Sequence, residues 1–338
     1  MTIRETLLLS IVIILMICNI VLLKITSVKG NSPRCKENFL NESRKDVFPI
    51  GFSIPESRIR SNVTTKTKWI SNLIPGQPCT YIYKKEADYY AEYATSVFAI
   101  TCQKGGWDCL RHYEILSQGC IPLFIGIERC PKNTMTFFPK KLLARTLEKL
   151  LPKMGQPLTE ELQEEIRNAT TILLEYTRQN LTTRAMAMYL CKKVYLFNPR
   201  QVLLISHFPH PDYLRCLTVH GMKCILGSAA HEVPRLDYLY KGADVGGLYG
   251  YGFSYTCDFT SDFRDDSRDK TLHEDIASRR YDLIIYPSFC NMEMKRPLWS
   301  EVNEKYSPSE IVLLCGNDMC DCKSMATLNG YPMFKREL

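Results

Sequence analysis

The sequence has little excess charge of either sign and no cluster of basic residues. It is 338 residues long and carries 43 Lys plus Arg against 36 Asp plus Glu, a formal net charge of +7. Proteins that bind nucleic acids concentrate positive charge on one segment or face. The composition therefore argues against a nucleic-acid partner, whereas a mild positive balance still suits small anionic substrates.

Metal-binding patterns are also absent. Cys315, Cys320 and Cys322 gather near the C-terminus, but no two close Cys-x-x-Cys pairs occur there and no His lies beside them. Zinc sites need such ligand sets, so we expect a disulfide or free thiols instead. No Asp-x-Asp lies next to a predicted strand, which leaves no support for a magnesium or manganese clamp. We predict a protein without a bound metal or other cofactor.

The chain lacks the composition of a disordered or fibrous protein. Hydrophobic residues make up 45% and charged residues 23% of it, while Gly and Pro number 17 and 18. These values are typical of globular domains. No internal repeat of solenoid period occurs, and the length beyond the N-terminal apolar stretch is enough for two packed domains.

One long apolar run is present. Residues 6–25 read TLLLSIVIILMICNIVLLKI, with Lys24 as the only charged residue. A helix of about 20 apolar residues spans a bilayer, so this segment predicts a single-pass signal anchor behind a tail over residues 1–5. A cleaved signal peptide is the alternative, although its apolar region is usually only about 7 to 15 residues long.

Two α/β lobes are expected after the anchor. Residues 26–78 are rich in Pro, Ser and Asn without a sustained period, which is typical of an irregular stem. Strands alternating with helices then predict parallel sheets. We expect strands over residues 79–83, 97–102, 120–125, 201–206, 223–227, 281–288 and 310–316, and helices over residues 87–95, 107–118, 158–179, 182–195, 212–220 and 299–306.

The predicted fold class is α/β, with two Rossmann-like lobes joined by helices. The expected segments are a first lobe over residues 79–157, bridging helices over residues 158–196, a second lobe over residues 197–325 and a tail over residues 326–338.

Residues 96–122, SVFAITCQKGGWDCLRHYEILSQGCIP, carry the most informative pattern. A buried strand leads into Gly105 and Gly106, and the following helix presents Arg111 and Glu114 one turn apart on one face. Backbone N–H groups and a guanidinium bind phosphate, and a carboxylate accepts hydrogen bonds from ribose hydroxyls. The alternative is an ordinary surface ion pair beside a glycine turn.

This segment resembles the nucleotide-sugar-binding segment of exostosin-like glycosyltransferases. There, a strand, a glycine-containing turn, an Arg, a Glu three residues later and a Gly-Cys-Ile-Pro element follow one another. The resemblance covers residues 96–139. The matching residues are Phe98, Cys102, Gly105, Arg111, Glu114, Gly119, Cys120, Ile121 and Pro122.

The resemblance implies a GT-B enzyme, in which two Rossmann-like lobes face each other and one of them holds a nucleotide-sugar donor. It assigns the diphosphate to Arg111 and the ribose to Glu114, with Gly105 and Gly106 in the donor site. In exostosin-like enzymes this segment lies in the later lobe, whereas here a further α/β region, residues 201–318, follows it. This departure leaves open which lobe holds the acceptor.

Three polar residues after the strand that ends at Ser206 are candidate catalytic groups. His207, His210 and Asp212 lie where the carboxyl end of a parallel strand usually meets a ligand, and one of them could deprotonate an acceptor hydroxyl. They could equally be polar loop residues without a catalytic task. The glycine-rich segment 242–252 is interpreted as a lid or a plain loop.

Two features of the sequence favour opposite orientations in the membrane. Basic residues follow the apolar run, which would place the body in the cytosol. Four glycosylation sequons, at Asn41, Asn62, Asn168 and Asn180, and 15 cysteines fit an oxidising lumen. Together with the resemblance, they favour a type II membrane protein of the Golgi or endoplasmic reticulum.

Three functions remain open. The first is a membrane-anchored, metal-independent glycosyltransferase that moves a sugar from a nucleotide-sugar to a hydroxyl of a glycan or glycoprotein. The second is a catalytically inactive carbohydrate-binding or assembly ectodomain of the same fold. The third is a cytosol-facing nucleotide-binding enzyme.

Overall fold

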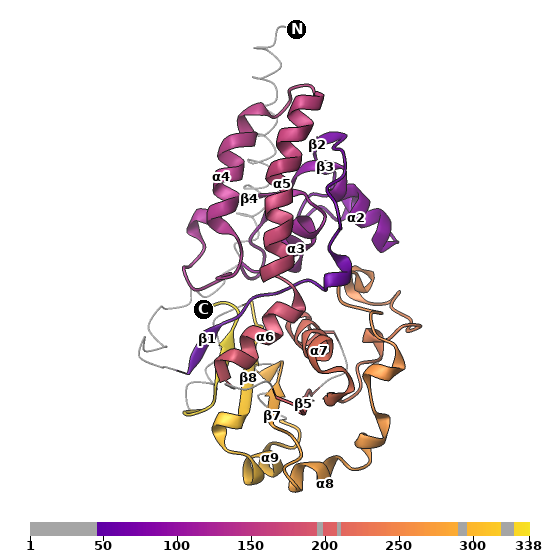
Figure 1. Ribbon diagram of the computed structural model, residues 1–338, viewed down its shortest axis with the longest axis vertical. Helices are drawn as coiled ribbons and strands as arrows, with labels where there is room; N and C mark the ends of the chain where they lie inside the picture. The colour runs from indigo at the N-terminus through magenta and orange to yellow at the C-terminus, as the bar shows by residue number, and fades with distance from the viewer. Residues whose placement is uncertain (1–45, 195–198, 208–210, 290–295, 319–327) are drawn as a thin grey trace.

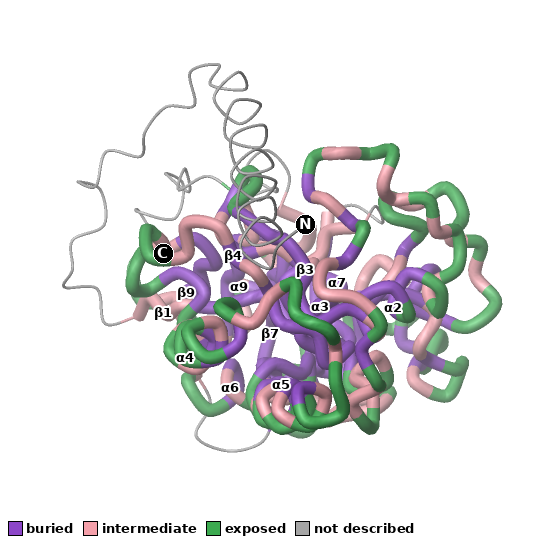
Figure 2. The backbone as a smooth tube through the Cα atoms, turned by 90° about the horizontal axis from the view of Figure 1, so that it is seen from above, coloured by how far each residue is buried: buried purple, intermediate pink, exposed green. Residues whose placement is uncertain are grey.

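The computed structural model describes residues 46–194, 199–207, 211–289, 296–318 and 328–338. In these residues the chain forms a three-stranded and a six-stranded sheet, and every strand pair is parallel. Helices flank both sheets (Figure 1). Parallel sheets are buried on both faces, and β3 and β7 lie in the buried interior of Figure 2. The predicted α/β class is confirmed, and the two sheets are consistent with two Rossmann-like lobes.

The first lobe, in the upper half of Figure 1, contains the three-stranded sheet in the order β2-β3-β4. The central strand β3 is buried along its whole length because helices cover it and every residue from Val97 to Ile100 is apolar. Its strands are β2 (Lys68–Ile70), β3 (Ser96–Cys102) and β4 (Ile121–Ile125), and its helices are α2 (Glu86–Ala94), α3 (Leu110–Ser117), α4 (Lys140–Leu150) and α5 (Glu160–Asn180).

The second lobe contains the six-stranded sheet in the order β1-β9-β8-β7-β5-β6. Its strands are β1 (Val47–Pro49), β5 (Val202–Ile205), β6 (Ala230–Val233), β7 (Leu283–Tyr286), β8 (Ile311–Cys315) and β9 (Met333–Lys335). Its helices are α6 (Thr183–Val194), α7 (Tyr213–Leu226), α8 (Leu272–Ala277) and α9 (Trp299–Lys305).

The six-stranded sheet has a topological switch point at β5. From β5 the chain adds β6 on one side, and the next strand, β7, pairs with β5 on the other side. In open α/β sheets, ligands bind outside the carboxyl ends of the strands at such a point. His207 lies two residues after the end of β5 and Ser288 two residues after the end of β7, so both residues lie near this position.

The chain crosses between the lobes at two neighbouring places. The segment after β1 runs up to the first lobe, and the turn between α5 and α6 leads back down. Ile54 N donates to Leu181 O at 2.9 Å, and Thr183 N donates to Ile54 O at 3.0 Å. These hydrogen bonds link the two crossing segments to each other, and together the crossings form the covalent connection between the lobes.

A continuous buried cluster extends through both lobes. It includes Val97 and Phe98 of β3, Ile50 and Phe52 of the crossing segment, and Val312 of β8. Burial of apolar area stabilises such a core by about 25 cal/mol per Å². The two lobes therefore form one packed body in this structure rather than two bodies separated by an open cleft.

Two predicted strands are wrong. Residues 79–83 alternate between apolar and polar side chains but form no strand, and a short 3-10 turn over Pro78–Thr80 occupies their start. Residues 223–227 are the last turn of α7 and its cap, because the helix continues from Tyr213 to Leu226 and ends at Gly227, which has a φ of 60°. The strand expected there is β6, a few residues later.

The segment boundaries also differ from those predicted. The expected stem, 26–78, contributes β1 to the second sheet and β2 to the first, and the expected tail, 326–338, contributes β9. Of the bridging helices, α5 packs on α3 and α4 in the first lobe, while α6 packs on α7 in the second.

The predicted anchor, residues 6–25, lies outside the described residues, as does the expected tail over 1–5. Among the residues that the structure does describe, no helix is both long enough and apolar enough to cross a bilayer.

Candidate functional site

Arg111 and Glu114 lie on α3 at the junction of the two lobes. The helix begins at Leu110 with Cys109 as its N-cap, three residues later than predicted, so Asp108 precedes the helix instead of lying in its first turn. Glu114 is buried, at 7% exposed, and Arg111 is half-buried. The spacing of three residues places both side chains on one face of the helix, as expected.

Glu114 is held by hydroxyl groups from both lobes. Tyr89 of α2 donates to Glu114 Oε2 at 2.7 Å, and Ser254 of the second lobe donates to Oε1. Tyr90 Oη lies 2.6 Å from Ser254 Oγ. Burial raises the pKa of Glu114, while the bonds from Ser254 and Tyr89 and the charge of Arg111 act in the opposite direction. In this state both carboxylate oxygens are occupied by protein donors.

The guanidinium of Arg111 lies among tyrosine rings. Its Cζ is 6.0 Å from the ring centroid of Tyr81, within the range of a cation–π contact. Arg111 Nη1 and Tyr81 Oη are both buried, and neither makes a hydrogen bond of good geometry in the described residues, although a contact between the two side chains acts to lower the pKa of Tyr81. A buried donor without a partner costs about 1–3 kcal/mol. The arrangement leaves a cationic N–H group able to bind an anion such as phosphate.

Gly105 and Gly106 lie against residues that follow strands of the second sheet. A Cβ atom at Gly105 would overlap the carboxylate of Asp318, which follows β8, and one at Gly106 would overlap the carboxylate of Glu337, which follows β9. Only glycine permits such a close approach. The carboxyl ends of β3, β8 and β9 thus face one another across the lobe junction.

The start of α3 is occupied by a protein carboxylate. Asp108 N donates to Glu337 Oε1 at 3.0 Å, and Arg336 Nη1 donates to the same oxygen at 2.8 Å and to Asp108 O. Burial raises the pKa values of Asp108 and Glu337, and the charge of Arg336 opposes both shifts. The N–H of Asp108, one of those expected in the first turn of this helix, is therefore bonded to Glu337 in this structure.

Two of the three predicted catalytic residues, His207 and Asp212, lie in the second lobe, and His210 lies outside the described residues. His207 is half-buried and follows β5. Asp212 is the N-cap of α7, with its Oδ1 accepting from Arg215 N at 2.9 Å. The next residue, Tyr213, is electrostatically coupled to Glu114: burial and then the negative charge of that carboxylate raise the pKa of Tyr213.

A second network at the junction joins the crossing segment to both lobes. Arg58 pairs with Glu86 of α2 and with Asp258 of the second lobe, and His220 Nε2 lies 2.7 Å from Asp258 Oδ2. Glu86 also accepts from Ser254 N. The loop that carries Ser254 is thus attached to the first lobe at its backbone and at its side chain.

Sequence reasoning missed the tyrosines and Ser254. Tyr89 and Tyr93 recur at helical spacing on α2, and their rings lie 5.1 Å apart. Such a pattern indicates a buried helix face, but nothing in the spacing shows that the face would meet Glu114. Ser254 follows the glycine-rich segment that the sequence singled out, 242–252, and its bond to Glu114 joins positions 140 residues apart.

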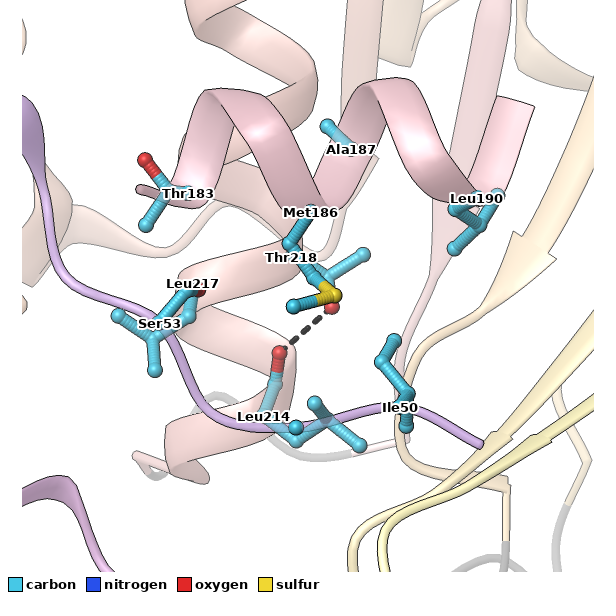
Figure 3. A pocket seen from close by; sticks show the side chains of 10 residues that line it. Ile50, Ser53, Thr183, Met186, Ala187, Leu190, Leu214, Leu217 and Thr218 are labelled. Atoms are coloured by element: carbon cyan, nitrogen blue, oxygen red, sulfur yellow. Dashed lines mark hydrogen bonds between the residues drawn. The ribbon is translucent and has the colours of Figure 1, made fainter. Parts of the chain in front are cut away.

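The cavity in Figure 3 is not large enough for a nucleotide. It lies between α6, α7 and the crossing segment and has room for about one water molecule. Its wall is mainly apolar, with Met186 and Leu190 on one side and Leu214 and Leu217 on the other. It fills the packing between two helices and takes no part in the site around Arg111.

Several further predictions stay predictions. In the described residues, no group of three or more His, Cys, Asp or Glu side chains is arranged to hold a metal ion. Asn62, Asn168 and Asn180 are exposed, and Asn41 lies outside the described residues.

Cys315 is disulfide-bonded, which is one of the two alternatives expected for the C-terminal cysteines. Nine other described cysteines are free thiols: Cys79, Cys102, Cys109, Cys120, Cys130, Cys191, Cys216, Cys224 and Cys257.

Comparison of the chain with protein-family models, with curated proteins and with solved structures finds no match.

Proposed function

We propose that this chain is a glycosyltransferase of the exostosin-like, GT-B type, which moves a sugar from a nucleotide-sugar donor to a hydroxyl group of a glycan or glycoprotein. The observation that carries the proposal is the buried Nη1 of Arg111, a cationic donor without a partner among the described residues, beside Glu114 at the lobe junction. A diphosphate supplies the missing acceptor, and a ribose supplies hydroxyls for the carboxylate.

The facing sheet edges support the same proposal. GT-B enzymes hold their substrates between two Rossmann-like lobes, and ligands of open parallel sheets bind at the carboxyl ends of strands. Here the turn after β3 contacts Asp318 after β8, and the switch point at β5 belongs to the same side of the second sheet. A donor bound at Arg111 therefore has residues of the second lobe opposite it.

The proposed mechanism depends on charge stabilisation without a metal ion. Arg111 stabilises the departing diphosphate, and Glu114 orients the donor through its ribose. A base after β5 removes the proton of the acceptor hydroxyl. We assign this role to His207 or His210, because Asp212 already uses its carboxylate to cap α7.

Donor binding requires a change at Glu114. Ser254 and Tyr89 occupy both of its oxygens, so a ribose must replace at least one of these donors. Exchanging one hydroxyl donor for another is close to neutral in free energy. The loop of Ser254 then moves away from α3 when the nucleotide enters and returns to cover it, as lids of transferases do to exclude water.

The test is a thermal-shift screen of the full-length chain in detergent micelles against UDP, GDP, CMP and their sugars, with and without Mn²⁺. A ligand that binds only the folded protein raises the melting temperature. We expect a shift with one nucleoside diphosphate that is lost in Arg111→Ala. The matched control is Arg167→Ala, an exposed arginine of α5 that pairs with Glu164. Folded protein that responds to no nucleotide would contradict the proposal.

The second candidate, a non-catalytic carbohydrate-binding or assembly ectodomain, is favoured by one observation. Protein carboxylates and hydroxyls already satisfy Glu114 and the backbone N–H of Asp108, as they would in a fold that has lost its donor. This alternative predicts that Arg111→Ala leaves function intact.

For the location, we propose a type II protein of the Golgi or endoplasmic reticulum with a lumenal body. The nine free cysteines favour instead a reducing compartment and a cytosol-facing body. Glycans on Asn168 or Asn180, detected as a mobility shift removed by endoglycosidase, would exclude the cytosolic orientation. Absence of glycans from both sites in protein made in a eukaryotic host would count against the lumenal one.

A further inference from the structure

Few large apolar side chains are exposed in the described part of the chain, and the two aromatic ones lie together. Tyr249 is 85% exposed and Tyr251 is 40% exposed, on one loop and two residues apart. The other four are aliphatic and belong to separate elements: Ile82, Leu151, Ile172 and Met188. An exposed pair of aromatic rings is a recognisable feature of binding surfaces.

Several residues of this loop, residues 249–256, have left-handed backbone angles. Gly250 and Tyr251 both have left-handed backbone angles, with φ of 61° and 55°. Ser254 has a φ of 74°. A residue with a Cβ costs roughly 1 kcal/mol in this region, and glycine does not. Ser254 uses its side chain to bind Glu114, whereas the ring of Tyr251 lies 5.7 Å from that of Phe253 and remains 40% exposed.

The base of the loop is fixed against the donor site of the first lobe. Ser254 bonds Glu114 and Glu86, and the Phe253 ring packs on Tyr89 with 5.6 Å between centroids. In Figure 1 this orange segment rises from the second lobe to the vicinity of α2. The tip is therefore carried next to the Arg111–Glu114 pair.

The tip of the loop carries Tyr249, whose phenol acts electrostatically on Tyr81. The phenol of Tyr249 contributes to the raised pKa of Tyr81, after burial and the neighbouring charges, and Tyr81 is the ring that faces Arg111. A Cβ atom built at Gly247 or Gly250 would meet no other atom within 4 Å. The tip of the loop thus has a donor site on one side and open space on the other.

We propose that Tyr249 and Tyr251 form the acceptor-binding platform, on which a neutral oligosaccharide stacks its sugar rings. This inference rests on the proposed function and deepens it by placing the acceptor on the second lobe. Each sugar has an apolar face of C–H groups that packs on an aromatic ring, and the tyrosine hydroxyl adds a polar group at the rim. Because the two rings are spaced along one loop, they bind either two sugar units or two parts of the same sugar unit.

The absence of charged residues from this loop favours a neutral ligand over an acidic one. Residues 245–257 contain no Lys, Arg, Asp, Glu or His. A sulfated or uronic acid chain would need cations to replace the water that it loses. The loop is rich in Gly and Tyr, residues that are enriched in adaptable recognition surfaces.

The test is a glycan array probed with the detergent-solubilised full-length chain, comparing wild type with Tyr249→Ala/Tyr251→Ala. We expect binding to a set of neutral oligosaccharides, a loss of about tenfold or more in the double alanine variant and retention in Tyr249→Phe/Tyr251→Phe, which keeps both rings. The control is Met188→Ala, an exposed side chain of α6. Because these side chains are exposed, all variants should melt with the wild type.

Nucleotide binding measured on the same proteins separates this inference from the proposed function. If glycans bind through the two tyrosines but no nucleotide binds, the glycan-binding role of Tyr249 and Tyr251 is supported and the glycosyltransferase function is contradicted. If nucleotides bind while no neutral glycan does, or if the double alanine variant binds glycans like the wild type, the platform is wrong. Binding confined to acidic glycans would also overturn it.

Discussion

Helix α3 meets the second lobe at two contacts that differ in how completely their charged groups are paired. At its start, Arg336 bonds Asp108 O, Gly316 O, Glu337 and Asp318, a closed set that fixes the lobes together. On its other face, Arg111 has a buried N–H group with no partner in the described residues. Full pairing is typical of a structural contact, whereas a buried N–H group without a partner is one whose role needs an explanation, and under the proposed function that role is to bind the donor.

The closed contact is the stronger one, and breaking it should have the largest effect on stability. Arg336 is fully buried, so Arg336→Met leaves the carboxylates of Asp108 and Glu337 without their cation. We expect a loss of about 3–5 kcal/mol, measured by urea unfolding. Arg111→Met should cost clearly less, because the wild-type guanidinium is itself incompletely bonded. Equal losses in the two variants would refute the distinction between the contacts.

The two glycines allow a finer test of the closed contact. A Cβ at Gly106 overlaps the carboxylate of Glu337, which is 6% exposed and held by Asp108 N and Arg336, whereas one at Gly105 overlaps that of Asp318, whose side chain is 56% exposed. We expect Gly106→Ala to lower the free energy of unfolding by about 1–3 kcal/mol and Gly105→Ala to lower it by less. The reverse order in thermal melts would contradict the packing described here.

At the incomplete contact, removing the hydroxyl of Ser254 should loosen the loop over α3. Ser254→Ala takes a donor from the buried Glu114, which costs roughly 1–2 kcal/mol, and it also removes the group that competes with a ribose. Nucleotide binding should therefore become a few-fold tighter while the protein becomes less stable. Ser228→Ala, at an exposed position after α7, serves as the control. Weaker nucleotide binding in the loop variant would show that Ser254 contacts the donor.

The smallest effect concerns the dependence of stability on pH. Glu114 has a raised pKa in the folded protein, so the folded state binds its proton more tightly than the unfolded chain does, where the pKa of Glu is about 4.3. This contribution to stability is present below that pH and is lost as the pH rises through the raised pKa. The Glu114→Gln variant has no titrating carboxyl group at this position and therefore lacks this pH-dependent contribution to stability.

Unfolding free energies of wild type and Glu114→Gln, measured from about pH 4 to pH 7, should show this difference. We expect the free energy of unfolding of Glu114→Gln to increase relative to that of the wild type as the pH rises. Asp108 and Glu337 titrate in both proteins and cancel in the comparison. A difference that does not change with pH would mean that Glu114 is ionised as easily in the folded chain as in the unfolded one.

The sequence predicts the parts of the fold that depend on local patterns. Continuous apolar runs identified β3, β4, β5, β7 and β8, and the Thr159 cap located the start of α5. The edge strand β1 and its neighbour β9 were not predicted because each has only three residues and the partner of Val47 is Met333. A pairing across nearly the whole chain has no local signal.

The same limit applies to the site. Arg111 and Glu114 stand out because they share one helix turn with a recognisable turn before it. Ser254, Tyr89 and Arg336 reach α3 only through tertiary packing, so their roles could not be derived from spacing. The sequence also could not show that Glu337 would occupy the N–H group of Asp108, because the two residues are brought together by β9.

The most direct test of the proposed function is the transfer of a radiolabelled sugar from a panel of UDP-, GDP- and CMP-sugars to a mixture of neutral oligosaccharides by the full-length chain, in the presence of EDTA. We predict transfer from one donor that persists in EDTA and falls by about a hundredfold or more in Arg111→Ala, with the Arg167→Ala control unchanged. No transfer from any donor by folded protein, or undiminished transfer by Arg111→Ala, would contradict the account.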